Sequence, residues 1–392
     1  MADNNKFIRS KLPNTGTTIF TTMSAMALEY GAVNLGQGFP DFDCDPHLLT
    51  LMEQALRKGH NQYAPMAGIM ALRETVSQQL SVLYGHQYDP MSEVTITAGA
   101  TQAIHTALSV VVHPGDEVIL FEPVYDSYEP VIRLNGGNPV YSRLQAPDYR
   151  PNWDEVRALV TPRTRAIVIN TPHNPTASIW AREDMETLAA LVRDTDIIII
   201  SDEVYEHIVY DGAQHESVSR YPQLAERSFM ISSFGKTFHV TGWKIAYCAA
   251  PAALMNEFRK AHQFVVFCVH APSQYALSEY MQLRKHVELK YFYQHKRDLF
   301  LTAAKDCGLR WFSSQGTYFV SASYAHLPKF APLCDREVAI WMTKKVGVAC
   351  IPLSSFYHDE FDEKIIRFCF AKQDSTLKVA AERLSTLESE AF

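Results

Sequence analysis

The chain has 392 residues, of which 47% are hydrophobic and 20% are charged, a composition that supports a sizeable buried core and argues against disorder. Its net charge of −7 argues against nucleic acid as the main partner, because proteins that bind nucleic acid usually present a basic face. Seven dispersed cysteines without a CxxC pair, no apolar leader and no apolar run long enough to cross a bilayer predict a cytoplasmic protein with no membrane partner.

Short β-rich runs alternate with helical patterns along most of the chain. An early helix is predicted after Asp45, with Pro46 at its first position and Gly59 at its end. The predicted strands then cover residues 94–97, 117–121, 166–170, 197–201, 229–232 and 244–249. This alternation favours an α/β fold with a mainly parallel central sheet flanked by helices.

Polar or aromatic residues directly follow five of these runs. The segments are TITAGATQA, LFEPVYDSY, VINTPHNPT, IISDEVYEH and ISSFGKT. In open α/β sheets the carboxyl ends of the parallel strands form the ligand crevice. We therefore expect these five segments to meet at one site.

Lys236, in the last of these segments, lies among small and hydroxyl residues with no acid close by in sequence. A P-loop is excluded because that motif requires a glycine where this chain has Met230. Most lysines are solvated surface residues, but a lysine in a crevice can lose its proton and become a nucleophilic amine. With Ser233 and Lys244 as phosphate ligands, Lys236 would suit a Schiff base with pyridoxal 5′-phosphate (PLP).

Asp202 follows a run of four isoleucines. It could cap a helix, or bind a metal together with Glu203, although neighbouring side chains diverge and no further His or Asp lies at ligand spacing. A buried carboxylate here could instead face the cationic ring nitrogen of a cofactor. Tyr205 would project from the same side if the turn is helical, and is otherwise an ordinary half-buried tyrosine.

Weaker signals come from the first two segments. Gly99, Ala100 and Thr101 begin a predicted helix, whose free backbone N–H groups could bind phosphate. Tyr125 could stack on an aromatic ring. Small residues at a helix start and tyrosines in a core are both common, so neither signal is specific alone.

Asn174 lies in the turn NTPHNPT, where its amide could donate to a cofactor oxygen or a substrate carboxylate. The Asn174–Pro175 bond is a candidate cis peptide. Arg367 lies in the apolar, strand-like run EKIIRFCFA, where it could form a cross-strand ion pair or clamp a carboxylate with two hydrogen bonds. The stretch NLGQGFPDF does not match GxGxxG and is predicted to be a loop near a ligand.

Together these motifs resemble the fold-type I PLP-dependent aminotransferases of class I/II over essentially the whole chain. The stretch SSFGKTFHVTGWKIAY is similar to the lysine signature of that family. The stretches NLGQGFPDF, NQYAPMAGIMALRE and ISDEVYEHI resemble the branch of bacterial methionine aminotransferases. They are similar, less closely, to kynurenine aminotransferases, also known as cysteine-conjugate β-lyases.

The resemblance implies a role for each matching position. Lys236 would form the Schiff base and Asp202 would pair with the pyridine nitrogen. The other implied cofactor ligands are Tyr125, Asn174 and Tyr205 at the ring, and Gly99, Ala100, Thr101, Ser233, Lys244 and Tyr63 of the partner subunit at the phosphate. The substrate α-carboxylate would be bound by Arg367, helped by Asn174 and the backbone of Gly36. No metal is implied.

The resemblance also implies the architecture. Residues 35–288 would form a large PLP-binding domain, 1–34 an N-terminal arm that belongs partly to the small domain, and 289–392 a small C-terminal α+β domain. The protein would be a homodimer with active sites at the interface.

The predicted activity moves the amino group of methionine, and of aromatic or hydrophobic amino acids, to a 2-oxo acid by a ping-pong mechanism. Aspartate is disfavoured because no second arginine can be placed for its side-chain carboxylate. Kynurenine aminotransferase or cysteine-S-conjugate β-lyase activity on the same site is the alternative. A ligand-sensing regulator would be expected to carry a basic DNA-binding domain, for which the about 30 residues before NLGQGFPDF leave little room.

Overall fold

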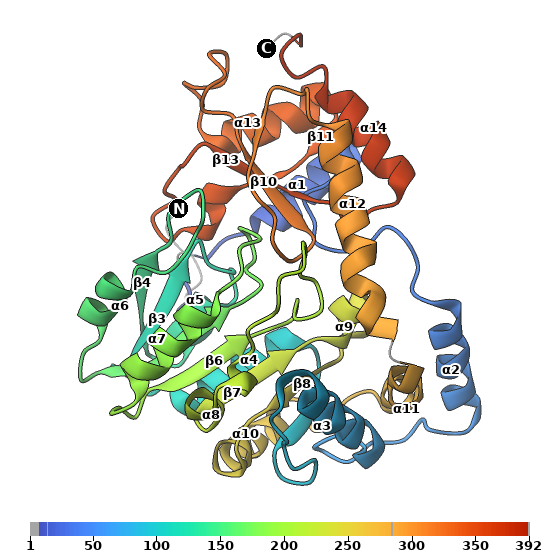
Figure 1. Cartoon of the computed structure of the whole chain (residues 1–392), viewed down its shortest axis with the longest axis vertical. Coiled ribbons are helices and arrows are strands. Elements are labelled where there is room, and N and C mark those ends of the chain that lie inside the picture. Colours follow the sequence, from blue (N-terminus) through green and yellow to red (C-terminus); the bar gives the residue numbers. More distant parts are fainter. Residues whose placement is uncertain (1–7, 14, 284, 391–392) are drawn as a thin grey trace.

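The structure, a computed structural model, describes residues 8–13, 15–283 and 285–390. Figure 1 shows a large part built on a seven-stranded sheet and, above it, a smaller part built on a four-stranded sheet. The long helix α12 (Leu289–Ala303) runs beside both parts. None of the helices in the described ranges is long and apolar enough to span a bilayer.

The central sheet contains all six strands that the sequence predicts. In spatial order its strands are β2 (Val94–Thr97), β8 (Ala246–Ala249), β7 (Ser228–Ser232), β6 (Ile198–Asp202), β5 (Thr164–Asn170), β3 (Glu117–Glu122) and β4 (Asn138–Arg143). Only β8 runs antiparallel to its neighbours. The sequence analysis missed β4, a mostly half-buried strand at the sheet edge that lacks a continuous apolar run.

Helices cover both faces of this sheet, as parallel strands require. One face packs against α4 (Ala100–Val111), α5 (Tyr128–Leu134) and α10 (Ala252–Val265). The remaining helices of the large part are α2 (Pro46–Arg57), α3 (Met70–Tyr84), α6 (Trp153–Leu159), α7 (Arg182–Val192), α8 (Pro222–Ala225), α9 (Phe234–Thr237) and α11 (Ala271–Tyr280). Alternate strand residues enter the two cores: Val168 faces α4, whereas Ile167 and Ile169 join the core on the other face.

The predicted early helix is α2. The Asp45 carboxylate accepts a hydrogen bond of 2.8 Å from the backbone N–H of His47, and Pro46 occupies the first position. The helix ends at Arg57, two residues before Gly59. Both the start and the stop signal in the sequence are thus confirmed.

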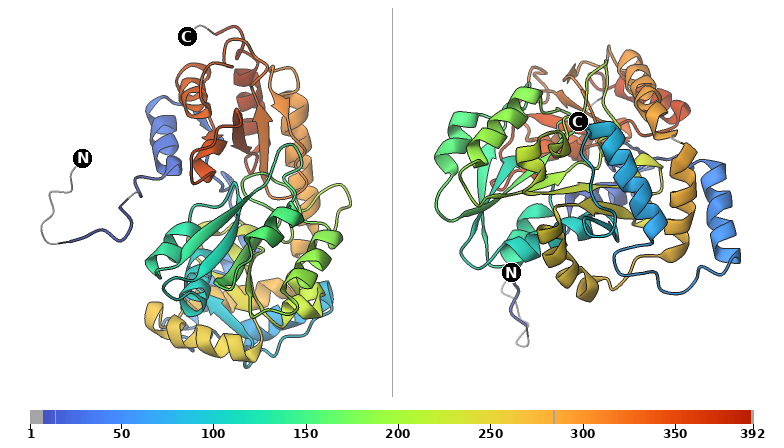
Figure 2. Two further views of the ribbon diagram at one scale, coloured as in Figure 1. Left: turned by 90° about the vertical axis from the view of Figure 1, so that its left-hand side faces the viewer. Right: turned by 60° about the horizontal axis from the view of Figure 1, so that its bottom comes forward.

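The small part combines the two ends of the chain. Its antiparallel sheet has the order β12 (Ile351–Pro352), β13 (Ile365–Cys369), β10 (Phe319–Ser323) and β9 (Arg310–Trp311). A two-stranded parallel sheet pairs β1 (Val33–Asn34) with β11 (Val348–Ala349). Its helices are α1 (Ile19–Glu29), α13 (Asp335–Trp341) and α14 (Asp374–Leu384), with α1 lying beside the C-terminal elements in Figure 2.

Hydrogen bonds connect the two parts next to the end of β3. The buried carboxylate of Glu122 accepts a hydrogen bond of 2.6 Å from the backbone N–H of His358. Arg143 in β4 forms an ion pair of 2.8 Å with Asp359. Burial raises the pKa of Glu122, while its bonds to His358 act in the opposite direction.

The prediction of a cis Asn174–Pro175 bond is wrong. Within the described residues, the cis bonds are Glu122–Pro123, Ala146–Pro147 and Thr171–Pro172. The turn NTPHNPT contains two X-Pro bonds, and local sequence does not distinguish them. The cis bond is at the first of the two.

Gly68, two residues before α3 begins, provides a test of the packing between this segment and the central sheet. It has a φ of +96°, and a Cβ atom there would lie 2.4 Å from Cγ1 of Ile96 in β2. We expect Gly68→Ala to lower the free energy of unfolding by about 3 kcal/mol, through backbone strain and overpacking together. Urea denaturation followed by circular dichroism measures the change.

Gly85→Ala is the matched control for that experiment. Gly85 ends α3 with a φ of +77°, but no atom of the described residues beyond its chain neighbours lies within 4 Å of the added Cβ. The loss should be only about 1 kcal/mol, because backbone strain acts there alone. Equal losses in the two variants would contradict the role assigned to Ile96.

Candidate active site

A cavity of about 270 Å³ lies at the carboxyl ends of the central strands, against the small part. Each of the five segments predicted to converge supplies wall residues, although they span residues 99 to 236 of the sequence. The predicted site residues that line it are Gly99, Ala100, Thr101, Tyr125, Asn174, Asp202, Tyr205, Ser233, Lys236, Lys244 and Arg367. Gly36 and Tyr63 are the two predicted residues that do not line it.

One end of the cavity is suited to an anion. Helix α4 begins there, no side chain caps its N-terminus, and Gly99 before it has a φ of +82°. A Cβ at Gly99 would lie 3.3 Å from Nζ of Lys244, so the missing side chain leaves room for the ammonium beside the helix start. Free N–H groups, the helix dipole and a lysine together favour a phosphate. Ser233 adds a hydroxyl to the same wall.

Asp202 ends β6 with a buried carboxylate. Its Oδ2 accepts a hydrogen bond of 2.5 Å from the phenol of Tyr128, and its Oδ1 accepts one of 3.3 Å from the backbone N–H of Val204. Burial raises the pKa of Asp202 to about 6, against the lowering effect of these two bonds. The sequence analysis missed Tyr128, which no local pattern distinguishes from a core tyrosine.

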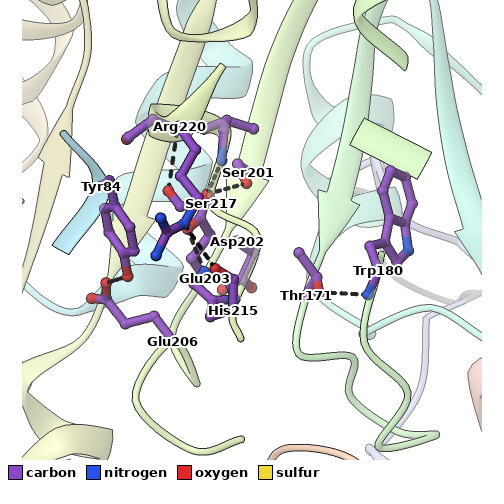
Figure 3. Close-up of polar contacts among 12 residues, drawn as sticks. Tyr84, Thr171, Trp180, Ser201, Asp202, Glu203, Glu206, His215, Ser217 and Arg220 are labelled. Carbon is purple, nitrogen blue, oxygen red and sulfur yellow. Dashed lines mark hydrogen bonds and ion pairs between the residues drawn. The ribbon is translucent and has the colours of Figure 1, made fainter. Parts of the chain in front are cut away.

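Two other acids, Glu203 and Glu206, anchor the segment after β6 through the hydrogen bonds drawn in Figure 3. The carboxylates of Glu203 and Glu206 are buried and do not line the cavity, whereas Asp202 and Tyr205 do. Glu203 accepts hydrogen bonds from Ser201 Oγ (2.7 Å), His215 Nε2 (2.7 Å) and the Val218 backbone (3.1 Å). Glu206 accepts from the phenols of Tyr84 and Tyr247. Because these hydrogen bonds anchor Glu203 and Glu206, they also fix the direction of the cavity-lining side chains of Asp202 and Tyr205.

Lys236 follows β7 and projects from α9 into the cavity wall. Its Nζ donates to the carbonyl of Gly38 at 3.2 Å and to Oη of Tyr318 at 2.8 Å. Burial lowers the pKa of the Lys236 amine to about 8. Within the described residues, no carboxylate lies at ion-pair distance from it. A much larger fraction of this amine is therefore neutral near physiological pH than of an ordinary lysine, although the ammonium still predominates.

Arg367, in β13, has a fully buried guanidinium without an acidic partner in the described part of the chain. The predicted alternative of a cross-strand ion pair is wrong, because its neighbours on the adjacent strands are Ser321 and Ile351. Its Nη1 donates to Oδ1 of Asn174 at 2.7 Å, and Phe319 stacks 3.9 Å from the guanidinium carbon. Its Nε has no hydrogen-bond partner in the structure.

Gly36 does not line the cavity but helps to hold the side chain of Arg367 in place. Its carbonyl accepts a hydrogen bond of 2.8 Å from Nη2 of Arg367, while its N–H donates to Oδ1 of Asn34 at 3.0 Å. Burial lowers the pKa of Arg367 to about 10. A buried guanidinium bound only by neutral oxygens is well suited to a carboxylate ligand.

Tyr63 lies on the surface, outside the cavity of its own chain. Its side chain is 82% exposed and packs edge-on against Phe267, which is 57% exposed. Phe264, nearby in sequence, is 87% exposed. Exposed aromatic side chains in such a group are typical of a surface that contacts another protein.

Comparison with known proteins gives consistent matches over the whole chain. The family model for aminotransferase class I and II matches residues 30–384. The methionine aminotransferase of Escherichia coli K12 is 46% identical over 389 residues, which cover 99% of this chain and 100% of that protein. The human kynurenine–oxoglutarate transaminase 1 is 35% identical and covers 92% of this chain and 93% of its own.

Solved structures agree with these matches. The structure of YbdL from Escherichia coli, whose reactivity identified a methionine aminotransferase function, superposes with a TM-score of 0.93 at 47% identity. That match covers 97% of this chain and 99% of the other. N-succinyldiaminopimelate aminotransferase from Mycobacterium tuberculosis superposes with a TM-score of 0.92 at 38% identity, over 97% and 100% of the two chains.

The lowered pKa of Lys236 can be measured in the cofactor-free protein. Only a neutral amine attacks acetic anhydride, so the acetylation rate of Lys236 should rise with pH and reach half its maximum at about pH 8. Peptide mass spectrometry reports each lysine separately. Lys305, which is 68% exposed, serves as the reference in the same sample. The assignment fails if Lys236 follows the same pH profile as Lys305.

Proposed function

The chain belongs to the aminotransferase class I and II family, and we propose that it transfers the amino group of methionine to a 2-oxo acid. Aromatic and other hydrophobic amino acids would serve as further donors. The observation that carries this proposal is the pairing, in one cavity, of a largely buried lysine amine with a buried arginine that has no acidic partner among the described residues. The Escherichia coli relative, at 46% identity, supports methionine as the donor.

Enzymes of this family depend on PLP, which when bound withdraws electrons from the α-carbon of the amino acid. The cavity fits this cofactor at both ends. We assign the phosphate to the start of α4, Ser233 and Lys244, where a Cβ at Gly99 would crowd the lysine. We assign the ring nitrogen to the buried carboxylate of Asp202.

The remaining predicted ligands face the space between these two ends. Tyr125 lines the wall and is suited to stacking on the ring. The phenol of Tyr205 and the amide nitrogen of Asn174, whose oxygen is already bound to Arg367, are left to donate to the ring oxygen. These assignments leave the guanidinium of Arg367 for the α-carboxylate of the substrate.

We assign the proton transfers to Lys236. As a neutral amine its Nζ removes the proton from the α-carbon of the donor, and as an ammonium it returns a proton at C4′ of the cofactor. A pKa lowered to about 8 supports both roles at physiological pH. The same cycle in reverse, with a 2-oxo acid as acceptor, completes a ping-pong mechanism.

The surroundings of Arg367 favour an uncharged substrate side chain. Phe20 and Phe356 pack edge-on, with ring centroids 5.8 Å apart, and both lie within 5.4 Å of the Arg367 guanidinium carbon. No second arginine lines the cavity within the described ranges. A thioether beside aromatic rings is a favourable contact, whereas a second carboxylate there would lack a partner.

A second candidate activity uses the same residues. The human kynurenine transaminase is a relative at 35% identity, and the aromatic surroundings of Arg367 also suit the side chain of kynurenine. Cysteine-S-conjugate β-elimination needs the same proton removal at the α-carbon. The two activities differ in products, because elimination releases pyruvate and ammonia without a 2-oxo acid acceptor.

We further propose a cytoplasmic homodimer in which Tyr63 completes the phosphate site of the other subunit. Its 82% exposure, together with the exposed Phe264 and Phe267, supports an interface at this surface. The seven cysteines are all unpaired and five of them are buried, which supports a reducing compartment.

A donor panel tests the proposed substrate. With a common 2-oxo acid acceptor, kcat/KM for methionine should exceed that for aspartate about a hundredfold, because the aspartate side chain would bury an unpaired carboxylate. Lys236→Ala, which lacks the base, should show no turnover with any donor. Aspartate preferred over methionine would overturn the substrate assignment, and pyruvate release from a cysteine conjugate without acceptor would favour the β-lyase alternative.

Mixed dimers test the shared site. Lys236→Ala and Tyr63→Ala are each expected to be nearly inactive, but a mixed dimer puts both defects in one site and leaves the other site intact. Refolding the two variants together should therefore restore about a quarter of the wild-type activity. Mixing without refolding is the control. If refolded mixtures stay as inactive as the separate variants, Tyr63 acts within its own subunit or has no role.

A further inference from the structure

Tyr318 contacts the reactive lysine and has no counterpart among the residues predicted from sequence. It directly precedes β10 in the small part, and its side chain is fully buried. Its Oη donates a hydrogen bond of 2.6 Å to the carbonyl of Gly38 and accepts one of 2.8 Å from Nζ of Lys236. Nζ also donates to the same carbonyl at 3.2 Å.

The distances in this triangle indicate which groups donate and which accept. A carbonyl only accepts, and Gly38 O lies nearer to the Tyr318 phenol oxygen (2.6 Å) than Nζ of Lys236 does (2.8 Å), so we place the single phenol hydrogen toward Gly38 O. The phenol oxygen must then accept from Lys236, and the amine donates to both neighbours. Burial raises the pKa of Tyr318 well above its ordinary value, so the phenol keeps its hydrogen at any physiological pH.

We propose that Tyr318 is a positioning residue for Lys236, a role that rests on the proton transfers assigned to that lysine. The phenol and the Gly38 carbonyl hold two of the amine's N–H groups, and neither donates to its lone pair. The lone pair is left free for the α-proton of the substrate in the cavity. An acceptor pair thus orients a base, where a hydrogen-bond donor in the same place would block it.

The three groups are held by rigid packing rather than by flexible side chains. The ring of Tyr318 packs against Tyr205 and Tyr293, with centroids 5.1 and 5.6 Å away. A Cβ at Gly38 would lie 2.6 Å from Cζ of Phe319, so glycine allows the carbonyl to reach this position. Lys236 comes from the large part and Tyr318 from the small part, so the amine is oriented only when the two parts are packed together.

Tyr318→Phe tests the proposal, because it removes one oxygen and keeps the ring. In the holoenzyme, kcat for methionine should fall about tenfold to a hundredfold with KM changed less than about threefold. The deuterium isotope effect at the α-carbon should rise, because proton removal becomes more rate-limiting. A merely structural role would not move the isotope effect.

A second readout does not depend on substrate or turnover. The phenol oxygen accepts more strongly from an ammonium than from an amine. In the cofactor-free protein, the pH midpoint for acetylation of Lys236 should therefore drop by about one unit in Tyr318→Phe. This shift is expected even if the preferred donor is not methionine, so failure of the positioning role is distinguishable from failure of the proposed function.

Tyr293→Phe is the matched control. Tyr293 is a buried phenol in the same aromatic cluster, and its Oη has no hydrogen-bond partner in the structure. Removal of the Tyr293 hydroxyl should leave kcat, the isotope effect and the pH midpoint for acetylation of Lys236 unchanged. The proposal is overturned if Tyr318→Phe behaves like Tyr293→Phe, or if it raises KM while kcat and the isotope effect stay constant.

Discussion

The structure depends on a surplus of positive charge in one cavity. Lys236, Lys244 and Arg367 line it, and the sole acidic residue in its described wall is Asp202. Buried charges without partners are costly, and like charges in one cavity repel each other. The arrangement is favourable only with a ligand that brings negative charge at two places, which a phosphorylated cofactor and an amino-acid carboxylate do. Ligand binding is therefore expected to raise the free energy of unfolding, which the unpaired buried charges lower in the empty protein.

Hydrogen bonds to groups outside the cavity offset part of the free-energy cost of burying charged side chains. Glu203 and Glu206 are buried acids too, yet each accepts two or more hydrogen bonds from groups that do not line the cavity. Arg367 is held in the same way by carbonyl oxygens, which fix its direction without neutralising it. The supporting residues therefore have their hydrogen-bonding groups paired, while the cavity-lining groups remain available to bind ligands.

The sequence predicts what depends on local pattern and on sheet topology. Parallel strands must end at one edge, so the convergence of Asp202 and Lys236 could be expected from apolar runs alone. The partners of these groups could not, because Tyr318 lies 82 residues from Lys236 and its oxygen makes the contact through tertiary packing. The sequence left open whether Arg367 forms a cross-strand ion pair or binds a carboxylate ligand. The register of β13 excludes the ion pair, and that register cannot be read from the local sequence.

One physical cause, burial, moves the pKa values of the lysine and the aspartate of the site in opposite directions. Burial favours the neutral form of each, which lowers the pKa of Lys236 to about 8 and raises that of Asp202 to about 6. For Lys236 this shift is useful as it stands, since a base must be neutral. For Asp202 it is useful only with a cation beside it, which would favour the carboxylate again. The aspartate therefore discriminates for a ring nitrogen that carries a proton, and the bond from Tyr128 keeps its carboxylate aimed at the cavity.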